Sequence, residues 1–326
     1  MASPLLSVRD LTTVIRTEGI EFEVVRGVSF DMYPNEILGL VGESGCGKTM
    51  TALSVMGLIP APAARIAGGT VLFGDRDLVS LSERDMREVR GDDISMIFQD
   101  PLTSLDPMFR IGHLLTEVIR RHRPVSRSQA EAMALQALAE VELPDPETRM
   151  SQYPHQLSGG MRQRVMIAMA LMLDPDILIA DEPTTALDVT VQAQILDRLL
   201  GQQRRRGMSM LLITHDLGVV AAVADRVAVM YSGEIVEQAP VTQLFSDPQH
   251  PYTQGLLRAV PQTRHQRGAL HTIPGRVPPP QFVPPGCPFS PRCSQALARC
   301  WEEHPDLVPE NGRRLRCFNP QPLTPA

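Results

Sequence analysis

The chain has 326 residues, of which 43% are hydrophobic and 21% are charged, as in an ordinary globular protein. This composition excludes a largely disordered chain, and the length allows two domains or one large domain with additions. The net charge of −6 argues against a nucleic-acid partner held by bulk charge.

Two features bear on the cellular compartment. A membrane-spanning helix needs about 20 consecutive apolar residues; the best apolar runs, 165–173 and 217–230, are too short or interrupted by charges. Residues 1–10 contain no basic stretch followed by an apolar core, which argues against a signal peptide. We therefore expect a cytoplasmic protein, where clustered cysteines indicate metal or cluster ligation more than disulfides.

Strand-like and helix-like segments alternate along the chain. Short apolar runs bounded by polar residues or glycine predict buried strands at 37–41, 177–180 and 210–213. Helical spacing predicts helices at 50–57 and 128–141. Strands separated by helices predict a mostly parallel sheet covered on both faces.

Capping residues and prolines indicate where the helices begin and end and where regular structure is absent. Ser126 or Ser128 is the expected N-cap of the second helix, and Pro144 lies beyond its end. From residue 274 to 291, eight of 18 residues are proline, and proline lacks the amide donor of a central strand or helix interior. This stretch is therefore expected to be an extended connector.

Residues 42–49 fit the pattern G-x-x-x-x-G-K-[ST] between an expected strand and an expected helix. The motif consists of Gly42, Glu43, Ser44, Gly45, Cys46, Gly47, Lys48 and Thr49. Its glycines let backbone N–H groups turn inward around phosphate oxygens at a helix N-terminus. Lys48 is expected to reach the β- and γ-phosphates, and Thr49 to bind Mg²⁺. Cys46 occupies a variable position, where we expect a passive filler rather than a redox sensor.

Two adjacent acids, Asp181 and Glu182, end the apolar run 177–180. At a strand end beside a phosphate loop, Asp181 can hold Mg²⁺ through water, and Glu182 can polarise the water that attacks the γ-phosphate. Alone the pair is ambiguous, because two acids at a strand end also occur in solvated turns.

Residues 157–161 read LSGGM and offer a second phosphate-binding helix start, formed by Ser158, Gly159 and Gly160. With the phosphate loop and the acid pair, this stretch resembles the signature motif of the ABC ATPase family, and Arg162-Gln163-Arg164 follow as they do there. The resemblance implies an ATPase in which the signature of one subunit closes over the phosphate loop of another.

The resemblance assigns further residues. Gln99 matches the glutamine that contacts Mg²⁺ and the attacking water, so Thr49, Gln99 and Asp181 form the implied Mg²⁺ set. Asp188 matches the dimer-contact loop, and His215 the histidine that touches the γ-phosphate. Glu182, His215 and Gln99 are thus the implied catalytic residues.

One position departs from the family pattern. The family stacks adenine on an aromatic residue where Ile15 stands here, and Phe22 is the nearby aromatic. We expect the base to pack on Ile15 or to meet Phe22 instead.

The branch of the family follows from two segments. Residues 99–107, QDPLTSLDP, and the stretch 250–257, which begins HPYT, resemble the ATPases of dipeptide, oligopeptide and nickel importers. The resemblance implies ATP-powered import of peptides, with nickel or glutathione as the alternative solute. A soluble ABC ATPase outside transport is a further alternative.

The same resemblance implies partners and a location. These are two transmembrane permease subunits, an extracytoplasmic solute-binding protein and a sister ATPase, with a homodimer as the alternative to that heterodimer. The chain would then lie peripherally on the cytoplasmic face of the inner or plasma membrane.

Four of the five cysteines lie in the last 40 residues: Cys287, Cys293, Cys300 and Cys317, separated by 5, 6 and 16 residues. Four thiolates can hold tetrahedral Zn²⁺ or a [4Fe–4S] cluster. The loose spacing lacks the close pairs of zinc sites and favours the cluster, which some ATPases of this branch carry. Unmetallated thiols are the remaining alternative.

These observations together predict an α/β fold with a phosphate-loop (RecA-like) ABC ATPase core and an antiparallel β part. A helical subdomain is expected at about 100–165 within an ATPase domain of residues 1–240. A C-terminal extension with the four cysteines is expected at 241–326.

Overall fold

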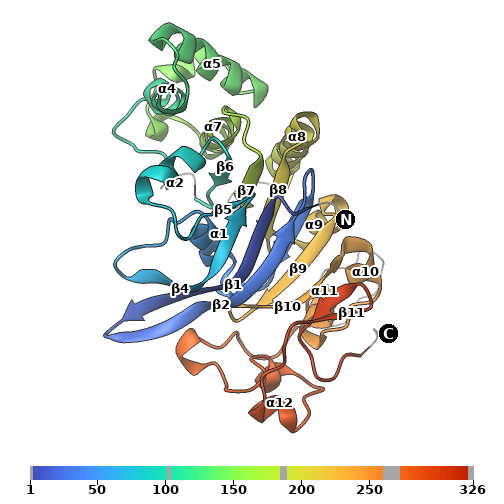
Figure 1. The fold of residues 1–326 in the computed structure, drawn as a ribbon. Coiled ribbons are helices and arrows are strands. Elements are labelled where there is room, and N and C mark those ends of the chain that lie inside the picture. The colour runs from blue at the N-terminus through green and yellow to red at the C-terminus, as the bar shows by residue number, and fades with distance from the viewer. Residues whose placement is uncertain (1–2, 101–103, 184–188, 260–271, 322–326) are drawn as a thin grey trace. The chain divides into compact units, whose positions relative to one another are not determined.

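The computed structural model describes residues 3–100, 104–183, 189–259 and 272–321, with the side chains of 189–191 excepted. The chain forms two compact units, residues 1–80 together with 212–326, and residues 81–211. Figure 1 shows the elements of both units along the chain. The expected domain boundary near residue 240 stays a prediction, since the units follow a different division of the chain.

A four-stranded antiparallel sheet forms one part of the first unit. Its strands are β1 (Leu6–Thr17), β2 (Ile20–Met32), β4 (Ala64–Phe73) and β5 (Arg76–Asp77), in the order β2-β1-β4-β5. Alternate residues of β1 and β2, such as Leu6, Val8 and Phe30, are fully buried on one face. This sheet agrees with the antiparallel β part expected from the sequence.

A second sheet of the first unit carries the phosphate loop. In it, β3 (Ile37–Val41) pairs in parallel with β9 (Arg226–Tyr231), with Gly39 opposite Val227. Beyond β9 follow β10 (Glu234–Pro240), β12 (Arg313–Leu315) and β11 (Val308–Glu310), all antiparallel to their neighbours. All five residues of β3 are buried, as the continuous apolar run predicted. The antiparallel strands β10 to β12 were not predicted.

Short helices complete the first unit. They are α1 (Lys48–Val55), α9 (Leu217–Val223), α10 (Val241–Ser246), α11 (Pro251–Ala259) and α12 (Arg299–Glu302). The proline-rich stretch 274–291 contains only two 3₁₀ turns, Pro280–Phe282 and Ser290–Arg292. Its extended character agrees with the expectation from proline content.

The second unit combines a parallel strand pair with helices. Strands β6 (Ile94–Ile97) and β7 (Ile177–Asp181) pair in parallel, with Ile94 opposite Ile177. The helices and turn are α2 (Glu83–Val89), α4 (Ile111–His122), α5 (Arg127–Glu140), α6 (Pro146–Met150), the 3₁₀ turn Pro154–Gln156, α7 (Gly159–Leu171) and α8 (Val189–Arg206). The boundary between the units falls within β8 (Ser209–Thr214).

Of the two candidate N-caps of α5, Ser126 and Ser128, the structure shows Ser126. Its hydroxyl accepts a hydrogen bond from the Gln129 amide, and the Gln129 side chain accepts one from the Ser126 amide. This reciprocal capping box satisfies two amide groups that a helix N-terminus otherwise leaves unpaired. The helix therefore begins at Arg127, one residue before the predicted start.

Within the described ranges, no helix combines the length and apolar character that crossing a membrane requires.

Candidate functional site

The phosphate loop joins β3 to α1 in the first unit. A Cβ at Gly42 would lie 2.2 Å from the carbonyl oxygen of Met230, and one at Gly47 would lie 2.7 Å from that of Val24. Both distances are shorter than real Cβ contacts, so only glycine fits at these two positions. The loop can therefore run close against β2 and β9.

Lys48 is buried inside this loop. Its Nζ donates hydrogen bonds to the carbonyl oxygens of Gly42, at 2.8 Å, and Glu43, at 3.0 Å. An ammonium in this place offers its charge where a polyphosphate would meet the loop. Cys46 is also buried, and burial raises the pKa of its thiol. A protonated, enclosed thiol agrees with the expected role of a passive filler.

The two acids end β7 in the second unit. Asp181 is 1% exposed, and Glu182 follows it in the left-handed backbone region with φ of 44°. The carboxylate of Glu182 accepts a hydrogen bond from Gln99 Nε2 at 3.0 Å. The sequence predicted both residues for the same reaction, and the structure places them in contact.

The LSGGM stretch opens helix α7, as expected. The Ser158 hydroxyl caps the helix by accepting from the Met161 amide at 3.3 Å, and a Cβ at Gly159 would meet no atom within 4 Å. An uncrowded, capped helix start can approach an anion closely.

Gln163, in the same helix, was not assigned a role from the sequence. It is 1% exposed and donates a hydrogen bond to the carbonyl oxygen of Pro183. The signature helix is thereby fixed to the residue that follows Glu182. A glutamine on the buried face of a helix is the signal that would have singled it out.

The remaining predicted residues are placed as follows. His215 is exposed directly after β8, and Asp216 behind it caps α9 by accepting from the Gly218 and Val219 amides at 2.8 and 3.1 Å. Asp188 lies outside the described residues.

Two more positions concern the base and the metal. Ile15 and Phe22 lie opposite each other on β1 and β2, and both are half-buried. Because they are neighbours, either side chain can supply an apolar contact at the same position of the sheet. Thr49 is half-buried in the first turn of α1. The phosphate loop and His215 belong to the first unit, whereas Gln99, the signature residues and the two acids belong to the second.

The four C-terminal cysteines line one cavity of about 20 Å³. The Cys287 amide donates to the Cys300 carbonyl oxygen at 2.8 Å, and the Asn319 amide donates to Cys317 Sγ at 3.4 Å. Burial raises the pKa of Cys287 to about 11 and that of Cys317 to about 12. The thiols of Cys287 and Cys317 therefore stay protonated unless a cation stabilises their thiolates.

As a donor set, the four thiols suit a soft metal or a cluster, and an N–H group directed at a sulfur is a usual support for a thiolate ligand. Their present arrangement does not yet form a coordination sphere. In the part of the chain that the structure describes, no three His, Cys, Asp or Glu side chains are arranged to hold a metal ion. A cavity of this size holds about one water molecule.

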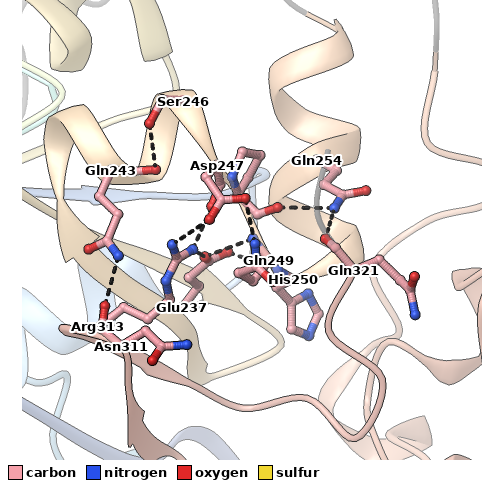
Figure 2. A network of polar contacts seen from close by, with 11 residues as sticks. Glu237, Gln243, Ser246, Asp247, Gln249, His250, Gln254, Asn311, Arg313 and Gln321 are labelled. Atoms are coloured by element: carbon pink, nitrogen blue, oxygen red, sulfur yellow. Dashed lines mark hydrogen bonds and ion pairs between the residues drawn. The ribbon is translucent and has the colours of Figure 1, made fainter. Parts of the chain in front are cut away.

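A buried polar network attaches the C-terminal region to β10 (Figure 2). The fully buried Glu237 accepts hydrogen bonds from Arg313 Nη1 at 3.1 Å and from the amides of Gln249 and His250, each at 3.0 Å. Arg313 Nη2 reaches Asp247 at 2.9 Å. Burial lowers the pKa of His250 to about 3, so its imidazole is neutral. The network fixes the start of α11 beside the strand that bears Glu237.

Comparisons with known proteins agree with this geometry. The sequence profile of the ABC transporter family matches residues 25–185, and that of the oligopeptide/dipeptide transporter C-terminal region matches residues 236–300. The dipeptide transport ATP-binding protein DppD of Bacillus subtilis is 52% identical over 96% of this chain and 94% of its own length. The oligopeptide transport ATP-binding protein AppD of the same organism is 47% identical over 97% of each.

Solved structures share the fold. The dimeric structure of MJ0796, a bacterial ABC transporter cassette, has a TM-score of 0.64 and 26% identity, covering 72% of this chain and 98% of that one. A post-hydrolysis state of the same cassette, bound to ADP and Pi, has a TM-score of 0.65. The predicted ABC ATPase fold is thereby confirmed.

The chain therefore belongs to the ABC transporter family, among the ATP-binding proteins that carry the oligopeptide/dipeptide transporter C-terminal region. Members of this family are ATPases. Family membership therefore confirms the predicted enzyme class and the predicted use of ATP and Mg²⁺.

Proposed function

We propose that this chain is the ATP-hydrolysing subunit of an importer of peptides. The observation that carries the proposal is that one chain matches both the ABC transporter family, over residues 25–185, and the oligopeptide/dipeptide transporter C-terminal region, over residues 236–300. Within the first unit the two matched segments are in contact, since Arg292 pairs with Glu43. The names of DppD and AppD, which match over nearly the whole chain, support dipeptides or oligopeptides as the solute.

ATP binding would use the phosphate loop. The loop amides and Lys48 would hold the β- and γ-phosphates, with Lys48 exchanging its bonds to the loop carbonyls for bonds to phosphate oxygens. Thr49, Gln99 and Asp181 would hold Mg²⁺, which supplies charge neutralisation between the phosphates when it is bound. The base would rest against Ile15 or Phe22.

Hydrolysis would use the second set of residues. Glu182 would orient the attacking water and take its proton, and its hydrogen bond from Gln99 would hold the carboxylate in place. His215 would donate a hydrogen bond to the γ-phosphate. Ser158, Gly159 and Gly160 of a second subunit would cover the phosphates, and Asp188 would lie in the dimer contact. The family resemblance favours a sister ATPase as the second subunit, and a homodimer is chemically possible because the motifs of both half-sites are present in this chain.

The similarity to dipeptide and oligopeptide transport ATP-binding proteins supports two transmembrane permease subunits and an extracytoplasmic solute-binding protein as further partners. The chain would sit peripherally on the cytoplasmic face of the inner or plasma membrane, and no nucleic acid is assigned.

Uptake measurements test the proposed function. Cells that lack this chain should regain uptake of labelled dipeptides or oligopeptides when the wild-type gene is restored, but not with Glu182→Gln. Parallel uptake of nickel and glutathione distinguishes the two alternative solutes. Normal uptake of all three solutes without the chain, with no permease co-purifying, would support a non-transport ATPase instead.

We further propose that Cys287, Cys293, Cys300 and Cys317 hold a [4Fe–4S] cluster, with Zn²⁺ as the alternative. Support comes from their common cavity and from their wide spacing in the chain. The bound cluster or metal ion would have a structural role and would stabilise the fold of the C-terminal region. The test is anaerobic purification with a visible absorbance spectrum and analysis of iron, sulfide and zinc. Cys300→Ser should lose the metal, whereas Cys46→Ser, which changes a cysteine outside the cavity, should keep it. Wild-type protein without metal would overturn the proposal.

A further inference from the structure

Glu43 of the phosphate loop is paired with an arginine from the C-terminal region. Arg292 Nη1 lies 2.6 Å from Glu43 Oε2, and Arg292 Nη2 lies 3.0 Å from Oε1, across 249 residues of chain. The Arg292 side chain is only 4% exposed. A bidentate guanidinium–carboxylate pair fixes both position and orientation. The pair therefore holds the side chain of Glu43 in a single arrangement.

The backbone of Glu43 is held by the same region. Its amide donates to the Tyr252 hydroxyl at 2.9 Å, and Tyr252, in α11, is completely buried. On its other side, the Glu43 carbonyl oxygen accepts from Lys48 Nζ at 3.0 Å. Side chain, amide and carbonyl of one loop residue are thus each engaged, two of them by the C-terminal region.

The anchors themselves are rigidly packed. The rings of Tyr231, Tyr252 and Phe289 contact one another, with centroids 4.7 to 5.4 Å apart. The Arg292 guanidinium lies 5.7 Å from the Tyr231 ring centroid. Aromatic packing of this kind restrains the groups attached to it. The buried network of Figure 2 holds the residue before α11, His250, whose Nδ1 accepts from the Tyr252 amide at 3.1 Å.

We propose that Arg292 and Tyr252 are positioning residues for nucleotide binding, through which the C-terminal region sets the conformation and charge of the phosphate loop. Tyr252 restrains the peptide group before Glu43. Arg292 compensates the Glu43 carboxylate, which would otherwise place an unpaired negative charge beside the phosphates. The inference rests on the proposed binding of ATP at this loop. Neither residue would touch the nucleotide.

The charge part of the proposal predicts a rescue. Arg292→Gln leaves Glu43 uncompensated, and should weaken ATP binding on the order of tenfold, a usual size for coupling between two sites. Adding Glu43→Gln removes that uncompensated charge, so the double variant should recover most of the affinity. Arg292→Lys keeps the charge without the bidentate geometry and should lie between wild type and Arg292→Gln. Tyr252→Phe should weaken binding by a smaller factor, because the ring packing remains.

The experiment uses the full-length chain and measures the ATP dissociation constant, the KM and kcat of hydrolysis, and the unfolding temperature. Arg292→Gln should raise the dissociation constant and KM together while kcat changes little. Arg316→Gln is the matched control, because Arg316 is another largely buried arginine of this region, bonded to the carbonyls of Ile235 and Pro305 and not to the loop. It should alter the unfolding temperature without altering ATP affinity.

Three results would overturn the inference. They are an unchanged ATP affinity in Arg292→Gln, the absence of rescue by Glu43→Gln, and an equal loss of affinity in Arg316→Gln. If Arg292→Gln does not fold, Arg292→Lys and Tyr252→Phe carry the same comparison. Failure of the wild-type chain to bind ATP would instead refute the proposed function, so the two failures are distinguishable.

Discussion

The carboxylate of Glu237 in β10 and the guanidinium of Arg313 in β12 form a fully enclosed ion pair, with Nη1 3.1 Å from Oε1 and side-chain exposures of 0% and 3%. The two residues lie 76 positions apart in the chain. The amides of Gln249 and His250 also bind Glu237, so this one carboxylate contacts both β12 and the segment just before α11.

Removal of one partner of this pair should be costly. Arg313→Ala leaves a buried carboxylate without its cation, which typically destabilises a protein by about 3–5 kcal/mol. The measurement is the free energy of unfolding in a denaturant titration. The control is Arg9→Ala, which breaks the exposed pair with Asp31 and should cost about 0–1 kcal/mol. Equal losses for the two variants would contradict the structural role given to Arg313.

Glu182→Gln should stop turnover while ATP binding survives. The amide cannot accept the proton of the attacking water, so kcat should fall by about 100-fold or more. Single-turnover hydrolysis and a separate ATP-binding titration check the two halves of this prediction. Glu310→Gln, at an exposed position of β11, serves as the matched control. Retained hydrolysis in Glu182→Gln would remove that residue from the catalytic assignment.

Two glycine substitutions in the phosphate loop should differ sharply in their effect on ATP binding. Gly42→Ala would force a Cβ to within 2.2 Å of the Met230 carbonyl oxygen, so the loop must shift and ATP binding should be lost. Gly45→Ala meets no atom within 4 Å, although its φ of +79° carries some strain. We expect only a small effect there. Nucleotide titration of both variants checks the contrast, which equal affinities would disprove.

Stability should respond to pH through Asp176. Asp176 is exposed, but the protein atoms around its carboxyl displace part of its water, which raises its pKa above the ordinary value near 3.8, and the carboxylates of Asp93 and Asp92 raise it further. The folded state therefore binds the proton more tightly than the unfolded state, and stability falls as pH rises through this range. Asp176→Asn should raise the unfolding temperature at neutral pH by a small amount, because solvent screens an exposed carboxyl, and the difference should shrink under acid conditions below both pKa values. Calorimetry at the two conditions tests the sign; a difference that grows on acidification would be the opposite result.

Much of the site was predictable because its motifs are local. Residues 42–49 predict a phosphate loop from their own glycines and lysine, and the apolar run before Asp181 predicts a strand that ends at the acids. Ser158 caps its helix from within the same turn. The clustering of four cysteines was likewise visible, although the single small cavity that they line was not.

The rest depended on segments that meet only in the folded chain. Gln99 reaches Glu182 across 83 residues, Arg313 reaches Glu237 across 76, and Arg292 reaches Glu43 across 249. No spacing rule connects such residues, because their contact follows from the order of strands in a sheet and from the packing of helices and turns on it. The sequence alone therefore determined the chemistry of the phosphate loop and its family. Tertiary structure decided which part of the chain holds that loop in place, since a carboxylate and a guanidinium pair only where the fold brings them within bonding distance.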